Sequence, residues 1–282
     1  MSAHGRGTNS GISPGSFALH TFLVGYSVLT LVPFLWAFLT SLKTTREVSD
    51  AAQLLPVAFN LDAYRTILAS DFKTWFFNSM FVALTVTVLG VASNSLAGYA
   101  LARLRFRGRA PVFRLLLLLV MVPAQVTMIP AFLVVANLGL ADTHGGLVLT
   151  SIVSIASIFM MRQFFISFPT EIEEAAKLDG CGTLQTFWRV VLPMAAPALA
   201  TQAIFVFMGV WNEFMKPLLY IASLDKYMLT QGLNAAAKQY EKSAAWNITM
   251  AGSIISVLPI LALYIVLNKY FIRLNDRAGG SK

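Results

Sequence analysis

The sequence predicts an all-α membrane protein with six transmembrane helices and one polar loop on the cytoplasmic side. Two observations lead to this prediction. Of the 282 residues, 57% are hydrophobic and only 12% are charged, whereas a soluble domain carries roughly 25% charged residues. Several apolar runs also exceed the roughly 20 residues that an α-helix needs to cross the hydrocarbon core of a bilayer.

The expected elements follow from the apolar runs and the segments between them. Residues 1–16 are rich in Gly and Ser and are expected to form a flexible N-terminal tail. The first span, 17–42, lacks a small-residue cleavage site after it, so it is expected to remain in the mature protein. An external loop (43–74), a five-helix core (75–270) and a cytoplasmic tail (271–282) follow. The core spans are expected at 75–102, 112–137, 145–168, 196–222 and 246–270.

The distribution of Lys and Arg predicts the orientation. The loop after the second span is rich in arginine, whereas the loop between the third and fourth spans, LGLADTH, has neither Lys nor Arg. The arginines are Arg103, Arg105, Arg107, Arg109 and Arg114. This loop is therefore predicted to be cytoplasmic, together with both termini and the polar insert 171–193. The loops 43–74, 138–144 and 223–245 are then outside.

Composition also excludes several functions. The net charge of +8 comes from basic residues that gather beside apolar segments, so membrane lipid is an expected partner and nucleic acid is not. The single cysteine, Cys181, and the scattered His4, His20 and His144 predict no metal site, no catalytic residues and no cofactor in this chain. No GxxxxGK[ST] motif is present, so ATP is not expected to bind here through a P-loop.

The insert 171–193, EIEEAAKLDGCGTLQTFWRVVLP, is predicted to form two short helices joined by a turn. Thr170 is expected to cap the first helix, and Glu173 to complete a capping box. Gly180 is expected to end this helix, because glycine readily adopts the left-handed conformation. The second helix is expected to end at Pro193.

The first helix of the insert is more suited to a protein partner than to a lipid surface. Ile172, Ala175 and Ala176 are expected to form a face with little side-chain bulk, which permits close approach. A helix lying on lipid is the alternative, but such helices usually carry Lys and Arg on their polar face. This one is acidic instead, with Glu171, Glu173, Glu174 and Asp179.

The motif Glu174-Ala175-Ala176, three residues, Gly180, nine residues, Val190, one residue, then Leu192-Pro193 resembles the EAA loop of bacterial ABC importer permeases. The segments LKTTREV, NLDAYRTIL, MVPAQVTMIP and WNEFMKPLL resemble the carbohydrate-uptake branch of that family, and in particular the G-type subunit of maltose-type transporters. The resemblance implies that the loop is a coupling helix seated in a cytoplasmic ATPase. The residues to which it assigns this coupling are Glu174, Ala175, Ala176, Asp179, Gly180, Leu192 and Pro193.

The resemblance also implies the setting of the protein. The expected partners are a second, homologous permease of the F type, two ATPase subunits that bind ATP and Mg, and an extracytoplasmic solute-binding protein. The expected location is the bacterial inner membrane, and the expected substrate is a sugar, a di- or oligosaccharide. An importer of glycerol-phosphate or a polyol is the alternative. A secondary transporter usually shows internal repeats and intramembrane ion-coupling charges, but the six expected helices are unrepeated and carry few charges. A polytopic membrane enzyme would need a His/Asp/Glu or Cys/His cluster near one membrane face, and the sequence shows none.

Five residues in the spans are candidates for the translocation path: Asn94, Gln125, Trp211, Asn212 and Glu213. A hydrogen bond between helices is the favoured role of Asn94. A carboxylate is costly near lipid, so Glu213 is expected to face the bundle or a watery cavity, with Lys216 as a candidate partner.

Small residues and prolines suggest the shape of two spans. Gly98 and Ala102 have the small-xxx-small spacing of closely packed helices. Pro123 and Pro130 bracket Gln125 in the third span, where proline frees backbone carbonyls, and a broken helix is expected there.

Overall fold

The computed structural model describes residues 14–50, 52–241 and 245–279, and every regular element in these residues is helical. The α-helices are α1 (Pro14–Ser41), α2 (Thr45–Ser49), α3 (Asp62–Ala69), α4 (Phe72–Arg103), α5 (Arg109–Val120), α6 (Ala124–Asn137), α7 (His144–Ser151), α8 (Ile155–Ser167), α9 (Thr170–Leu178), α10 (Thr183–Thr186), α11 (Leu192–Met194), α12 (Ala196–Trp211), α13 (Met215–Tyr220), α14 (Leu229–Glu241) and α15 (Trp246–Gly279). A π-helical turn spans Phe187–Val191, and a 3₁₀ turn spans Leu224–Lys226.

The predicted fold class is confirmed. Within the described residues, four helical segments are long and apolar enough to cross a membrane: Ala18–Ser41, Phe72–Arg103, His144–Ser167 and Trp246–Leu267. Two bent helix pairs are also long and apolar enough when each pair is taken together: α5 with α6, and the segment Thr183–Met194 with α12. If each pair is one span, the number of spans in the described residues rises to six. The two additional spans are therefore bent and are not straight rods.

The third predicted span, 112–137, is broken at the first of its two prolines. α5 and α6 meet at an angle of 108°, and Pro123 stands between them with φ −58° and ψ 133°. Proline has no N–H to donate and disfavours helical geometry in the residue before it. Pro130 lies inside α6, which continues through it.

The fifth predicted span, 196–222, is shorter in the structure. α12 ends at Trp211 after 16 residues, and the chain then leaves helical geometry before α13 begins. The physical reason is Glu213, whose Oε1 accepts hydrogen bonds from the backbone N–H groups of Phe214 and Met215, both at 3.1 Å. This carboxylate satisfies donors at the start of a new helix, as an N-terminal cap does.

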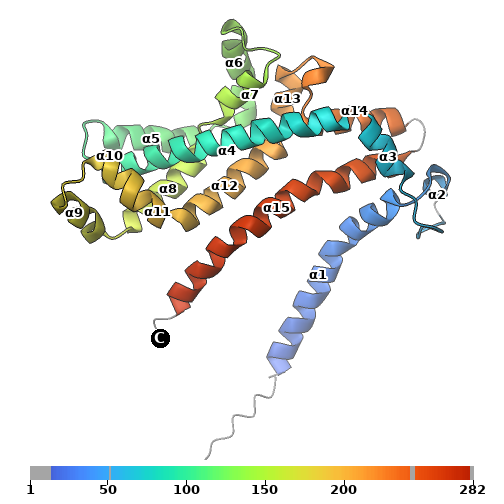
Figure 1. Cartoon of the computed structure of the whole chain (residues 1–282), viewed down its shortest axis with the longest axis horizontal. Helices are drawn as coiled ribbons and strands as arrows, with labels where there is room; N and C mark the ends of the chain where they lie inside the picture. The colour runs from blue at the N-terminus through green and yellow to red at the C-terminus, as the bar shows by residue number, and fades with distance from the viewer. Residues whose placement is uncertain (1–13, 51, 242–244, 280–282) are drawn as a thin grey trace, which may run out of the picture.

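α4 is the central helix of the fold and packs on α8 and α12 (Figure 1). The contact with α8 is close: a Cβ added at Gly98 would lie 2.8 Å from Cβ of Met161 and 3.1 Å from the carbonyl oxygen of Ile158. Ala102 is also buried. The small-xxx-small spacing therefore marks a real helix–helix contact.

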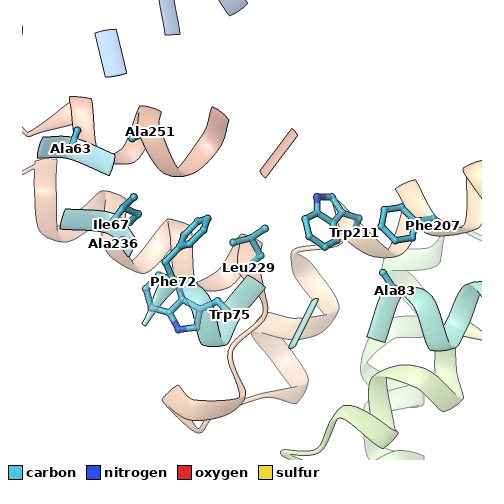
Figure 2. Close-up of a cluster of buried hydrophobic side chains, with 10 residues drawn as sticks. All are labelled: Ala63, Ile67, Phe72, Trp75, Ala83, Phe207, Trp211, Leu229, Ala236 and Ala251. Carbon is cyan, nitrogen blue, oxygen red and sulfur yellow. The ribbon is translucent and has the colours of Figure 1, made fainter. Parts of the chain in front are cut away.

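A second packing layer surrounds α15, which contacts α1, α3, α12 and α14. A buried apolar cluster joins α3, α4, α12, α14 and α15, as Figure 2 shows. Its members are Ala63, Ile67, Phe72, Trp75, Ala83, Phe207, Trp211, Leu229, Ala236 and Ala251.

The predicted tails and the first external loop contain more helix than expected. α1 begins at Pro14, inside the predicted tail 1–16, and the rest of that tail lies outside the described residues. α15 runs past residue 270 to Gly279, so the described part of the predicted tail 271–282 is helical. The predicted loop 43–74 contains α2 and α3.

Candidate functional site

The polar insert folds as the expected pair of helical segments, but its first cap differs from the prediction. Thr170 is already helical in α9, the preceding Pro169 occupies the N-cap position, and no side chain caps the helix. The predicted capping box is therefore wrong. Pro169 favours this start because its fixed φ suits the entry to a helix.

Glu173 instead points inward, to the end of α4. Its Oε1 lies 3.0 Å from Nε of Arg103, and the two side chains are only 8% and 13% exposed. The Tyr99 hydroxyl donates to its other carboxylate oxygen at 3.2 Å. Glu173 therefore fastens the insert to the transmembrane bundle and is not part of its outer surface.

The two alanines of the motif lie on different sides of α9. Ala176 is buried and Ile172 packs against a buried cluster that contains Tyr99, Phe165 and Phe187, whereas Ala175 and Glu174 are exposed. Leu178, at the end of the helix, is 90% exposed. The predicted face of Ile172, Ala175 and Ala176 is thus divided: Ile172 and Ala176 turn toward the bundle, and Ala175 lies on the exposed side.

The turn after α9 follows the prediction. Gly180 has φ +86°, in the left-handed region that favours glycine, and Asp179 and Gly180 are exposed. The second segment continues from Thr183 through the π-helical turn to Met194, and it meets α12 at 81°. In it, Leu192 is partly buried and Pro193 is exposed, close to this bend.

A cavity of about 600 Å³ lies where two helix interruptions meet. One interruption is the α7–α8 break at 152–154, and the other is the α12–α13 break at 212–214. Hydroxyl groups of Thr150, Ser151, Ser154 and Ser157 line the cavity, together with the charged side chains Glu213 and Lys216 and apolar residues of α4, α8 and α12. Interrupted helices in a membrane bring polar backbone and side chains to one place, as substrate sites require.

Glu213 and Lys216 both line this cavity but do not form an ion pair, so the expected pairing is absent. Glu213 accepts backbone hydrogen bonds at the start of α13. The Lys216 ammonium donates instead to the Thr150 carbonyl at 3.4 Å and to the Ser151 hydroxyl at 3.3 Å. Each charge is thus held at the edge of one helix interruption.

Asn94 is 1% exposed and bonds to both sides of the α7–α8 break. Its amide nitrogen donates to the Ile152 carbonyl at 3.0 Å, and its amide oxygen accepts from the Ser154 backbone N–H at 3.1 Å. This geometry supports the contact between helices that the sequence favoured, because Asn94 satisfies backbone groups that the break leaves free.

The other three path candidates lie away from the cavity lining. Trp211 is 3% exposed, stacks on Phe207 with ring centroids 5.6 Å apart, and donates from its indole N–H to the Ser256 carbonyl at 3.1 Å (Figure 2). Its ring has no face open to a ligand in this chain. Asn212 is exposed and donates to the Met208 carbonyl at 2.9 Å. Gln125 is exposed near the start of α6.

The hydroxyl residues of the cavity were not among the site residues predicted from the sequence. Ser151, Ser154 and Ser157 are three residues apart in the fourth predicted span, and a spacing of three places side chains on one helical face. This polar stripe in an apolar span was the signal that could have identified them.

Asp142 joins two of the predicted outer loops. It adopts φ +53° and accepts hydrogen bonds from the backbone N–H groups of Ala222 (2.9 Å) and Ser223 (3.0 Å), and it pairs with Lys226 at 3.1 Å. The hydrogen bonds from the hydroxyl and N–H of Ser223, and then from Ala222 and Lys226, hold the pKa of the Asp142 carboxyl well below its ordinary value. The loops 138–144 and 223–245 are therefore in direct contact.

Comparison with known proteins gives a consistent set of matches. The family model for the binding-protein-dependent transport system inner membrane component matches residues 94–276. The chain is 32% identical over 253 residues to the diacetylchitobiose uptake system permease protein of Streptomyces coelicolor, covering 89% of this chain and 84% of that protein. It is 33% identical over 266 residues to the arabinooligosaccharides transport system permease protein of Bacillus subtilis, covering 90% and 92%.

The fold also matches solved structures. It superposes with a TM-score of 0.81 and 26% identity on a chain from a bacterial ABC transporter involved in the import of the acidic polysaccharide alginate, covering 96% of this chain and 100% of that one. A chain of the bacterial alginate transporter in complex with an alginate pentasaccharide-bound periplasmic protein matches with a TM-score of 0.63 and 15% identity, which shows the fold alone.

Proposed function

Because the chain belongs to the family of binding-protein-dependent transport system inner membrane components, we propose that it forms half of the path by which an oligosaccharide enters a bacterial cell. The observation that carries this proposal is the cavity between the α7–α8 and α12–α13 breaks. It combines hydroxyl groups, one carboxylate and one ammonium with apolar walls, and a sugar also presents hydroxyls beside apolar faces.

The substrate class rests on the relatives and on the charge of the cavity. Two relatives are named for diacetylchitobiose and arabinooligosaccharides. A phosphorylated substrate, such as glycerol-phosphate, favours a cluster of Arg and Lys, and Lys216 is the one cation among the described residues that line the cavity. An oligosaccharide is therefore the better fit, and glycerol-phosphate or a polyol is the second candidate.

The chain requires partners for this function. In the proposed assembly, a homologous F-type permease completes the path, two ATPase subunits supply the energy of ATP with Mg bound to them, and an extracytoplasmic solute-binding protein delivers the sugar. The most apolar stretch of α1 is not buried against the rest of the described chain. This helix can therefore contact lipid or the second permease.

The exposed side of α9 is the proposed coupling surface for an ATPase subunit. Glu174, Ala175 and Asp179 face outward, and Gly180 makes the turn that presents them. Ala176 and Leu192 act from within, since both pack toward the permease, and Pro193 lies near the bend into α12. In this arrangement α9, the Arg-rich loop and both termini are cytoplasmic.

Reconstitution of the complete complex tests the proposal. A solute-binding protein that binds the sugar should stimulate ATP hydrolysis and drive uptake of that sugar into proteoliposomes. Screening sugars, polyols and sugar phosphates by thermal shift of the binding protein identifies the ligand. If only a phosphorylated or peptidic ligand stabilised the binding protein, the oligosaccharide assignment would fail.

The coupling surface has its own test. Glu174→Lys should leave the protein inserted and abolish uptake, because it reverses the charge that faces the proposed basic partner. Gly180→Pro should do the same, because proline cannot adopt φ +86°. Normal uptake by either variant would argue against the coupling role of α9.

A further inference from the structure

The C-terminal end of α4 is joined to α9 by a buried ionic contact. The carboxylate of Glu173 lies 3.0 Å from Nε of Arg103. The Arg103 guanidinium also donates to the Phe168 carbonyl, directly after α8. One arginine therefore holds α4, the end of α8 and the first turn of α9 together.

An apolar cluster surrounds this contact and strengthens it. The Tyr99 ring lies 5.5 Å from the Phe165 ring and 4.9 Å from the Phe187 ring, and its hydroxyl bonds to Glu173. Phe165 and Phe187 are 0% and 1% exposed. In such surroundings, charge pairing is screened less by water, and the loss of one partner leaves the other charge buried and unpaired.

α4 is also bonded to the α7–α8 break, nine residues before Arg103. Asn94 on α4 bonds to the backbone of Ile152 and Ser154, and Ser154 lines the cavity. Between Asn94 and Arg103, Gly98 holds α4 in close contact with α8. A continuous set of packed and hydrogen-bonded groups therefore runs from α9 to the α7–α8 break.

We propose that Arg103 and Glu173 are positioning residues that make α9 and α4 move as one unit, and that Asn94 passes this movement to the cavity. The inference rests on the proposed function, in which an ATPase subunit displaces α9. A movement of α9 then pulls the end of α4, and Asn94 shifts the backbone of the α7–α8 break and the hydroxyl groups beside it. Packed helices with hydrogen bonds at both ends provide a physical route for such coupling.

The test measures sugar uptake and ATP hydrolysis together, in proteoliposomes that contain the full complex and its binding protein. Glu173→Gln keeps the shape of the side chain but removes the charge. We expect it to lower the number of sugars imported per ATP hydrolysed by about fivefold or more, which is the lower end of typical coupling effects. Asp62→Asn is the control: Asp62 carries the carboxylate of an exposed ion pair with Arg65 at 3.2 Å in α3, outside the proposed coupling surface, and the ratio of this variant should stay at the wild-type value.

Exchanging the two charges tests whether the effect arises from the ion pair or from one of the two residues alone. Arg103→Glu should lower the ratio, and the double variant Arg103→Glu with Glu173→Arg should recover most of it. A double variant that stayed as poor as Glu173→Gln would overturn the proposal, because the effect would then not arise from the pair. Asn94→Ala should lower the same ratio without any change in α9.

A purely structural role predicts a different result. In that case Glu173→Gln would reduce the amount of assembled complex and its melting temperature, while the ratio per assembled complex stayed unchanged, and the proposal would be refuted. If Glu173→Gln does not assemble, Tyr99→Phe decides, since it removes only the hydroxyl that bonds to Glu173. A lowered ratio in Tyr99→Phe supports the proposal, and an unchanged ratio overturns it.

The wild-type complex distinguishes this inference from the proposed function. If the wild type does not couple sugar uptake to ATP hydrolysis, the proposed function itself fails. If the wild type couples the two and Glu173→Gln retains its ratio, only the role of Arg103 and Glu173 fails.

Discussion

Gly98 offers a direct test of the packing between α4 and α8. An added methyl group at this position would lie 2.8 Å from Cβ of Met161, 3.0 Å from the backbone nitrogen of Arg162 and 3.1 Å from the carbonyl oxygen of Ile158. Favourable carbon contacts lie at about 3.5–4.0 Å. Two of these three atoms belong to the backbone of α8, so a change of rotamer cannot relieve the clash and the helices must separate.

The size of the effect follows from two opposing terms. Overpacking of this kind costs about 1–3 kcal/mol. Replacing glycine by alanine in a helix returns up to about 1 kcal/mol. Gly98→Ala should therefore lower the free energy of unfolding by up to about 2 kcal/mol, the difference between these terms.

Two other glycines supply matched controls. Gly25 in α1 and Gly209 in α12 have no atom within 4 Å of an added Cβ, so Gly25→Ala and Gly209→Ala should keep or slightly raise stability. The assay is equilibrium unfolding of the purified chain in mixed micelles titrated with SDS, followed by circular dichroism. If Gly98→Ala proved as stable as Gly209→Ala, the close contact of α4 and α8 at Gly98 would be refuted.

Three further predictions concern the loops and the cavity. Asp142→Asn should loosen the junction of the outer loops and lower the melting temperature at pH 7. Because the folded pKa of Asp142 is depressed, its contribution is complete above the unfolded value of about 3.9 and is lost as pH falls below it, so the two proteins should converge in acid; a constant difference would contradict this. In a Cys181→Ala background, Arg107→Cys and Lys177→Cys should resist an impermeant thiol reagent in intact cells, and labelling from outside would overturn the topology. Lys216→Met should slow sugar uptake without reducing assembly, and an unchanged uptake rate would exclude Lys216 from the path.

The local features of this chain were predictable because they depend on neighbouring residues alone. The apolar runs predicted the spans, since transfer into a bilayer depends mainly on the composition of a segment. The two prolines of the third span predicted a break, which the structure places at Pro123 and not at Pro130, and Gly180 predicted the left-handed turn after α9. In each case the cause is the covalent structure of a single residue.

The candidate site was only partly predictable. Glu213 was expected to face the bundle or a watery cavity, because a carboxylate is costly in lipid, and it lines the cavity between the helix breaks. Trp211 looked similar in the sequence but packs on Phe207 in the core. An aromatic residue suits both a core and a sugar site, and only the packing of neighbouring helices decides between them.

The sequence by itself determined the helical membrane fold, the polar insert and the turn that presents it, because hydropathy and backbone preference act over short distances. Only the tertiary structure decided that Glu173 pairs with Arg103 and that Asn94 closes the α7–α8 break. The partners in these contacts are separated by 70 and 58 or more positions along the chain. A buried polar group must find a partner, but which partner it finds depends on how distant helices pack.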